Sequence, residues 1–227
     1  MIPRVLHHIW INAADPSLPA PFSTYRDGWR ALHPDWTLRL WNLDNIDFPL
    51  VRPELLPLCA NYAQMADVLR LEVLHRHGGV YVDTDFEPIR PIDALVQGAE
   101  HVFCSEDGVS VSTGFLAAVP GSLLLRRCLD ALPQRLGAAP PNVESGPGFI
   151  TGQLLREGFD GGVRLLPSRL LYPYRMHEPE RAAGPFPDAY AVHRWAHSWS
   201  PPRSLTRRVA GRLRRAGGLP PPVGAGD

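Results

Sequence analysis

Residues 78–85 read Gly-Gly-Val-Tyr-Val-Asp-Thr-Asp, and this stretch decides the fold. Its apolar residues 80–82 form a short strand that runs directly into Asp83 and Asp85. The preceding residues 61–77 carry an apolar stripe with helical spacing, and the two glycines end that helix. In α/β folds, ligands bind at the carboxyl ends of the strands. The sequence therefore predicts an α/β protein with a ligand site at Asp83 and Asp85.

The rest of the chain supplies further elements around this helix and strand. A length of 227 residues fits one domain, which we place at residues 1–200. Residues 201–227 form a basic tail rich in proline, arginine and glycine. Within the domain we expect strands at residues 2–11, 36–41, 101–105, 109–112, 163–166 and 189–193, and helices at residues 22–32, 122–132 and 149–157.

The charge of the chain is balanced overall but unevenly distributed. The formal net charge is zero, with 23 basic residues, all arginine, and 23 acidic ones. Six of the arginines lie in residues 201–227 against a single carboxylate, Asp227, so the body of the protein is slightly acidic. Binding of nucleic acid needs a concentrated basic surface, and the charge therefore argues against a nucleic-acid partner.

The sequence at the two ends of the chain indicates where in the cell the protein is located. Residues 2–9 read as a strand with two histidines and not as a signal peptide, and no stretch approaches the roughly 20 apolar residues of a membrane span. We expect a cytoplasmic protein. The arginines of the tail, interleaved with Leu205, Val209 and Leu213, could hold it peripherally at the inner membrane surface. A disordered, soluble terminus is the alternative.

Asp83 and Asp85 are candidate metal ligands. Two carboxylates two residues apart, just beyond an apolar strand, can converge on one hard divalent cation such as Mn²⁺ or Mg²⁺. Such a cation neutralises the charge that develops on a departing nucleoside diphosphate. The alternative is a turn in which both aspartates accept hydrogen bonds from nearby backbone amides.

The surroundings of this motif resemble the glycosyltransferases with a DXD-containing sugar-binding region. This family includes Golgi α-mannosyltransferases and capsular polysaccharide enzymes, and the clostridial glucosylating toxins are distantly similar. Residues 66–70 (Ala-Asp-Val-Leu-Arg) and 78–85 match its central motif, and residues 2–11 and 33–41 match its first two strands. Residues 191–199 resemble its closing motif. The resemblance implies a GT-A fold, with one central mixed sheet flanked by helices, and a retaining transfer from a UDP- or GDP-sugar.

The resemblance also implies roles for the metal ligands. Asp85 would bind the metal directly, and Asp83 would act through water or through the hydroxyls of the ribose and the sugar. Both are then catalytic. The third ligand would come from the closing motif, where His193 matches best and His197 and Ser198 are alternatives.

The donor sugar and nucleotide would contact further residues by the same resemblance. Asp67 and Arg70 stand three apart in the expected helix, so they share one face and would bind the hydroxyls of the sugar. The alternative is a surface ion pair. Trp10 would stack on the base, with a place in the core as the alternative. Ser198 would also bind the donor, and Trp199 would close over it, again with a place in the core as the alternative.

Two other functions fit the same residues. A metal-dependent hydrolase of a nucleotide-sugar or phosphoester could use Asp83, Asp85 and His193, but it predicts carboxylates for a second metal. A non-catalytic nucleotide-sugar binding protein would use the same ligands without turnover. The transferase is the preferred interpretation, with a glycan, a lipid-linked molecule or another small molecule as acceptor.

Overall fold

The computed structural model describes residues 1–12, 15, 17–137, 139–158 and 162–196. The expected tail at residues 201–227 lies outside this part of the chain, as do His197, Ser198 and Trp199. Among the described residues, no helix is both long enough and apolar enough to cross a membrane.

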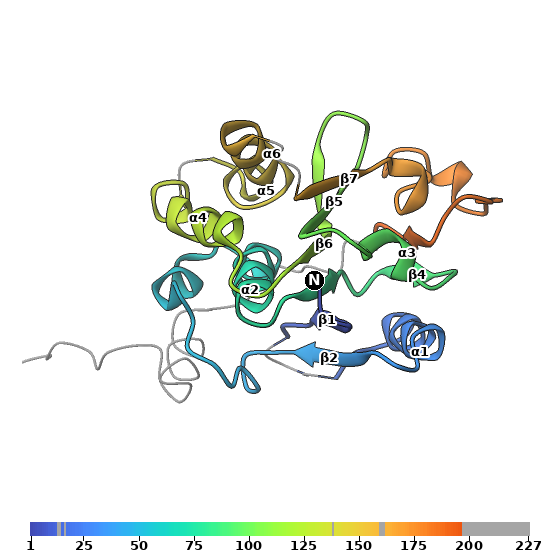
Figure 1. Cartoon of the computed structure of the whole chain (residues 1–227), viewed down its shortest axis with the longest axis horizontal. Coiled ribbons are helices and arrows are strands. Elements are labelled where there is room, and N and C mark those ends of the chain that lie inside the picture. The colour runs from blue at the N-terminus through green and yellow to red at the C-terminus, as the bar shows by residue number, and fades with distance from the viewer. Residues whose placement is uncertain (13–14, 16, 138, 159–161, 197–227) are drawn as a thin grey trace, which may run out of the picture.

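The centre of the molecule is a mixed six-stranded sheet in the order β2-β1-β3-β6-β5-β7 (Figure 1). Strand β1 pairs in parallel with β2 and β3, and β5 pairs in parallel with β7. Strand β6 is antiparallel to both β3 and β5. The strands are β1 (Val5–Ile9), β2 (Thr37–Trp41), β3 (Gly79–Val82), β5 (His101–Ser105), β6 (Val111–Ala118) and β7 (Val163–Leu166).

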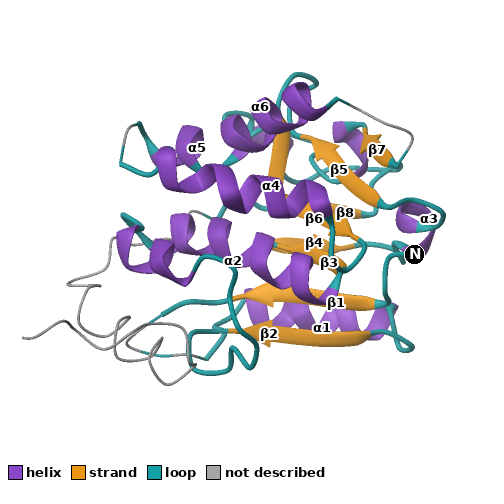
Figure 2. Cartoon of the chain, turned by 60° about the vertical axis from the view of Figure 1, so that its left-hand side comes forward, coloured by secondary structure: helices purple, strands orange, loops and turns teal. Residues whose placement is uncertain are grey.

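Helices cover both faces of this sheet (Figure 2). One face carries α2 (Tyr62–His77), α4 (Leu123–Ala131), α5 (Pro141–Glu144) and α6 (Pro147–Glu157), and the other carries α1 (Phe22–Leu32) and α3 (Asp93–Val96). Short 3-10 turns lie at Pro53–Leu58, Leu132–Gln134, Ser168–Leu170 and Pro179–Arg181. This arrangement confirms the expected α/β fold with a central mixed sheet.

Strand β3 shows why the sheet is buried on both sides. Val80 and Val82 belong to one core cluster, which also contains Trp29 of α1, whereas Tyr81 belongs to the other, with Leu69 of α2. Alternate side chains of a strand point to opposite faces, so a strand covered on both faces reads as a continuous apolar run. The apolar residues before Asp83 are therefore central to the core.

Helix α2 begins and ends at the residues that the sequence indicates. The side chain of Asn61 accepts a hydrogen bond of 2.9 Å from the backbone N–H of Gln64, which caps the start. Gly78 ends the helix with φ of 62°, and a Cβ there would lie 2.6 Å from the Cδ of Pro120. Both the backbone conformation and the space at this position therefore require glycine.

Two strands differ most from their expected extent. The first spans Val5–Ile9 and not residues 2–11. The strand expected at residues 109–112 is wrong at its start, because Val109 lies in a turn and is 84% exposed. The Asp107 carboxylate accepts hydrogen bonds from the N–H groups of Val109 and Ser110, which fixes this turn, and β6 then runs from Val111 to Ala118.

A small second sheet lies next to the motif. Strand β4 (Phe86–Pro88) follows Asp85 and pairs in antiparallel fashion with β8 (Ala191–His193), with Phe86 opposite His193. The strand expected at residues 189–193 therefore exists, but it pairs with β4 and not with the central sheet. This pairing brings the end of the described chain to the loop that carries the two aspartates.

Candidate metal centre and pocket

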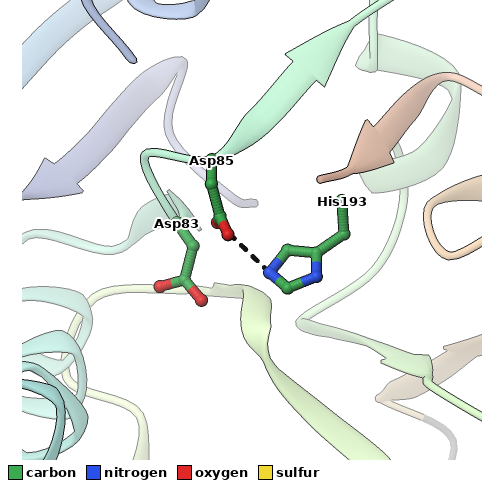
Figure 3. Close-up of side chains that lie close together, drawn as sticks. All are labelled: Asp83, Asp85 and His193. Carbon is green, nitrogen blue, oxygen red and sulfur yellow. Dashed lines mark ion pairs between the residues drawn. The ribbon is translucent and has the colours of Figure 1, made fainter. Parts of the chain in front are cut away.

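Asp83, Asp85 and His193 converge at the carboxyl end of β3. The loop between β3 and β4 carries both aspartates, and its first N–H, that of Asp83, donates to the carbonyl oxygen of Gly114 at 2.9 Å. Each of the three side chains offers one ligand atom, and these atoms lie within 4.8 Å of one another. Figure 3 shows Asp85 and His193 pointing toward each other with Asp83 beside them.

Asp85 is held by the segment that follows β8. His193 Nε2 lies 3.2 Å from Asp85 Oδ1, and the backbone N–H of Ala196 donates to Asp85 Oδ2 at 3.0 Å. The backbone N–H of Arg194 donates to the Asp85 carbonyl oxygen at 2.9 Å. Burial opposes ionisation of Asp85, but His193 and the Ala196 amide outweigh it and lower the pKa of this carboxyl group.

Aromatic rings fix the orientation of His193. The rings of Phe86 and Tyr172 lie 4.7 and 5.3 Å from the imidazole between centroids, and Trp195 meets it edge-on at 4.2 Å. Burial opposes protonation of His193, but the Asp85 carboxylate and the more distant acidic groups outweigh it, so its pKa is raised. Trp195 has φ of 53°, a backbone conformation that bulky residues rarely adopt.

Asp83 is held from the side of helix α2. The hydroxyl of Tyr81 donates a hydrogen bond to Asp83 Oδ1, and Arg70 Nη1 lies 3.4 Å from the same oxygen. The guanidinium of Arg70 also lies over the Tyr81 ring, 4.5 Å from its centroid, in a cation–π contact. A strand residue and a helix residue thus both act on this carboxylate.

Asp67 and Arg70 form an ion pair of 3.1 Å whose side chains are only 10% and 5% exposed. The alternative of a surface ion pair is therefore wrong, because α2 presents these residues to the interior. The Ser145 hydroxyl donates to Asp67 Oδ2 at 2.8 Å, and Arg70 also donates to the Thr113 carbonyl oxygen. Burial raises the pKa of Asp67 against the opposing effect of Arg70.

These residues line one pocket of about 710 Å³. Trp10 lies in its wall, is half-buried, and packs on Phe22 with ring centroids 5.4 Å apart. The indole Nε1 of Trp10 is buried without a hydrogen-bond partner in the described part of the chain. Trp10 therefore contacts both the pocket and the core. The lining also includes Ile9, Ala66, Asp67, Arg70, Asp83, Asp85, Glu106, Gly114, Tyr172, Met176, His193 and Trp195.

Sequence reasoning missed Glu106 and Tyr172 as lining residues. Glu106 directly follows β5, so it carries the signal that identified Asp83, a carboxylate just beyond a predicted strand. Burial raises the pKa of Glu106, while nearby His193 lowers it. Tyr172 lies in a loop and carries no signal of this kind; its hydroxyl is hydrogen-bonded to the Ser112 hydroxyl.

The three convergent side chains fit a hard divalent cation. Mn²⁺ and Mg²⁺ prefer oxygen ligands, and a neutral imidazole is an acceptable additional ligand for Mn²⁺. The group of Asp83, Asp85 and His193 is the one such group of three or more among the described residues. The second cluster of carboxylates that the hydrolase predicts is thus not found in the described part of the chain.

Comparisons with known proteins agree with this geometry. Residues 19–102 match the family model described as "Glycosyltransferase sugar-binding region containing DXD motif". An uncharacterized glycosyltransferase of Acanthamoeba polyphaga mimivirus is 24% identical over 221 residues, which cover 91% of this chain and 87% of the relative. Inositol phosphoceramide mannosyltransferase 1 of Schizosaccharomyces pombe is 27% identical over 216 residues, 87% of this chain but 62% of the longer relative.

A solved structure shares the fold. The PaToxG glycosyltransferase superposes with a TM-score of 0.55 at 19% identity and covers 69% of this chain and 70% of its own. The GT-A fold is thereby confirmed. The family model, the relatives and the shared fold together confirm the resemblance to the DXD-motif glycosyltransferases and support glycosyltransferase activity for this chain.

Proposed function

We propose that this chain is a metal-dependent, retaining hexosyltransferase that uses a UDP- or GDP-sugar. The acceptor is a hydroxyl group of a glycan, of a lipid-linked molecule or of another small molecule. The observation that carries the proposal is the convergence of Asp83, Asp85 and His193 in a pocket of about 710 Å³. A pocket of this size accommodates a ligand as large as a nucleotide-sugar.

The donor would lie along the pocket from Trp10 to the two aspartates. Trp10 offers an aromatic surface to the base, and Asp67 and Arg70 offer charged hydrogen-bonding groups to the sugar hydroxyls. Because Arg70 is already fixed by Asp67 and Asp83, little side-chain freedom is lost when it binds the sugar. Ser198 remains a prediction for binding of the donor, and Trp199 remains a prediction for the residue that closes over it.

The reaction breaks the bond between the sugar C1 and the oxygen of the β-phosphate and forms a bond from C1 to the acceptor oxygen. The acceptor proton passes to the departing diphosphate, which leaves as the nucleoside diphosphate. A Mn²⁺ or Mg²⁺ ion held by Asp83, Asp85 and His193 would neutralise the charge on this leaving group. Arg70 contributes a fixed positive charge beside Asp83.

Calorimetric binding of UDP and GDP, each with and without Mn²⁺, tests the metal and donor assignments. We expect one nucleotide to bind in a Mn²⁺-dependent manner. In Asp85→Asn this dependence should be lost and turnover of the matching nucleotide-sugar should fall at least about a thousandfold, since several kcal/mol of charge stabilisation disappear. Asp188→Asn, which changes a carboxylate that is 65% exposed in a surface pair, is the matched control.

The rival functions give different results in the same experiment. A hydrolase would release free sugar at the same rate whether or not an acceptor glycoside is added. A binding protein would show no turnover, and Asp85→Asn would only weaken nucleotide binding. Mn²⁺-independent binding of both nucleotides in a folded sample would contradict the metal assignment.

A further inference from the structure

Glu106 is a pocket carboxylate that the metal centre does not use. It opens the turn between β5 and β6, and its backbone N–H donates to the Ser110 carbonyl oxygen at 2.9 Å. The Ser105 hydroxyl accepts from the N–H of Gly108 at 2.8 Å, and Asp107 fixes the next two residues. These four hydrogen bonds therefore hold the turn that carries Glu106.

The sheet order puts Glu106 on the far side of the motif from Trp10. Strands β1, β3 and β5 run in the same direction, because β3 and β5 are both antiparallel to β6. Their carboxyl ends therefore meet at one edge of the sheet, where they are followed by Trp10, Asp83 and Glu106 respectively. In the order β1-β3-β6-β5, a donor that spans Trp10 and Asp83 leaves the Glu106 side for another ligand.

Glu106 lies near the metal ligands without joining them. Its charge acts on both His193 and Asp83, so it is within electrostatic reach of the reaction site. It does not belong to the group of side chains that converge on one ion. Within the described ranges, its carboxylate has neither an ion-pair partner nor a hydrogen-bond donor. A half-buried carboxylate that lines a pocket in this state is available to accept hydrogen bonds from a ligand.

The pocket that Glu106 lines has walls that suit a sugar. Tyr172, Trp195 and Met176 line the same pocket and supply apolar surface. Arg175 Nη2 donates to the Asp107 carbonyl oxygen at 3.2 Å, which ties the Met176 loop to the Glu106 turn. A charged oxygen in a pocket that also has aromatic walls matches a ligand with hydroxyl groups on an otherwise apolar ring.

We propose that Glu106 is an acceptor-binding residue, whose carboxylate accepts a hydrogen bond from a hydroxyl group of a glycan acceptor. This inference rests on the proposed transferase function and deepens it, since it assigns the acceptor to the β5 side of the site. Glu106 fixes the acceptor beside the donor C1 and takes no proton in this role. A charge-assisted hydrogen bond of this kind both orients and holds the acceptor.

The test compares transfer with donor hydrolysis. Wild type and Glu106→Gln are supplied with UDP-glucose, UDP-galactose, UDP-N-acetylglucosamine or GDP-mannose and Mn²⁺. Transfer to methyl α-mannoside, methyl β-galactoside and lactose is measured beside sugar release without acceptor. We expect the ratio of transfer to hydrolysis to fall about tenfold to hundredfold, with a raised acceptor KM and intact Mn²⁺-dependent nucleotide binding.

Two further variants guard against misinterpretation. Glu180→Gln changes an exposed carboxylate in the turn Pro179–Arg181 and should leave the ratio unchanged. Glu106→Asp keeps the charge at a shorter reach and should give a ratio between those of wild type and Glu106→Gln. If thermal unfolding shows that Glu106→Gln is unstable, the ratio of transfer to hydrolysis in Glu106→Asp alone tests the proposal.

Each other outcome overturns the assignment in a distinguishable way. An unchanged ratio, or an equal loss of transfer and hydrolysis, would show that Glu106 does not act on the acceptor. Lost Mn²⁺-dependent nucleotide binding would make it a metal ligand. A wild type that hydrolyses a donor but transfers to none of the glycosides would overturn the glycan acceptor alone. A wild type with neither turnover nor Mn²⁺-dependent binding would overturn the proposed function itself.

Discussion

The two aspartates of the motif stand two residues apart but in different surroundings. Asp83 faces helix α2, where Arg70 and the Tyr81 hydroxyl act on its carboxylate. Asp85 faces the β8 strand, where His193 and the Ala196 amide act on it. One carboxylate is thus held by the central body of the fold, and the other by a short strand that arrives more than a hundred residues later.

This difference indicates that the Asp83 side of the site is fixed, whereas on the Asp85 side a bound metal would replace the contact between Asp85 and His193. The guanidinium of Arg70 carries a permanent charge, so its attraction for Asp83 persists at every physiological pH. The imidazole of His193 is titratable, and a metal can bind it only when it is neutral. We therefore interpret Asp83 as a preformed ligand, and the Asp85–His193 pair as the part that a metal must separate.

Removal of Arg70 should have the largest effect on stability. In Arg70→Met, the carboxylates of Asp67 and Asp83 lose their shared cation in a buried position. We expect the free energy of unfolding to fall by about 3–5 kcal/mol, measured by urea denaturation at neutral pH.

A surface pair provides the control for Arg70. Arg30 lies 3.5 Å from Asp27, and the two side chains are 61% and 57% exposed. Arg30→Met should change the free energy of unfolding by less than about 1 kcal/mol, because solvent screens such pairs. Similar losses in the two variants would mean that Asp83 does not depend on a buried cation.

Removal of His193 should weaken metal binding without a large change in the stability of the fold. In His193→Ala, the group loses one of its three converging side chains, and Mn²⁺ affinity in the presence of the nucleotide should fall at least about tenfold. Titration calorimetry at fixed nucleotide concentration measures this change. Retained affinity would leave the third ligand to residues beyond the described part of the chain, and His197 and Ser198 are the candidates.

The pH dependence of Mn²⁺ binding sharpens the same test. The folded pKa of His193 is raised, because the nearby carboxylates outweigh the effect of burial. Its pairing with Asp85 therefore stabilises the metal-free protein at low pH, and this stabilisation is lost as the pH rises through that pKa. Mn²⁺ must displace the proton, so wild-type affinity should increase with pH by up to about tenfold per unit, and His193→Ala should show a flatter dependence.

The motif itself could be predicted because its determinants are local. An apolar strand that ends in two carboxylates, after a helix capped by Asn61 and closed by Gly78, is specified within 25 residues of sequence. The spacing of Asp67 and Arg70 likewise indicated a shared face of that helix. Spacing does not reveal whether a face meets solvent or the interior, and the burial of this pair depends on the strands and helices packed around α2.

The side of the pocket that carries Glu106 and Tyr172 could be predicted only in part. The position of Glu106 beyond a strand is visible in the sequence, but its place beside the motif depends on residues that are distant in sequence. Glu106 lies at the same edge of the sheet as the motif because β6 lies between β3 and β5 and is antiparallel to both, so that β3 and β5 run in the same direction. Tyr172 reaches the motif from a loop through its contact with Ser112, a residue 60 positions earlier. A strand order of this kind is set by pairing across the whole chain, and no local pattern around residues 101–112 determines it.

Substitution of Gly114 should have the smallest and most local effect on the Asp83 side of the site. Its backbone does not adopt positive φ, so glycine is required there for space and not for conformation. A Cβ at this position would lie 2.8 Å from both Asp83 Oδ2 and the Tyr172 hydroxyl. Gly114→Ala should therefore crowd the Asp83 carboxylate, lower the free energy of unfolding by about 1–2 kcal/mol, and weaken Mn²⁺ binding severalfold.

Gly152→Ala in α6 is the matched control for this crowding. A Cβ at Gly152 meets no atom within 4 Å, and alanine is the better helix former, so stability should rise by about 0.5–1 kcal/mol in urea denaturation. If Gly114→Ala also became more stable and kept its Mn²⁺ affinity, Asp83 could move away from β6 at little cost. The carboxylate would then be no more fixed than Asp85, and the division of the site into a preformed side and an exchangeable side would fail.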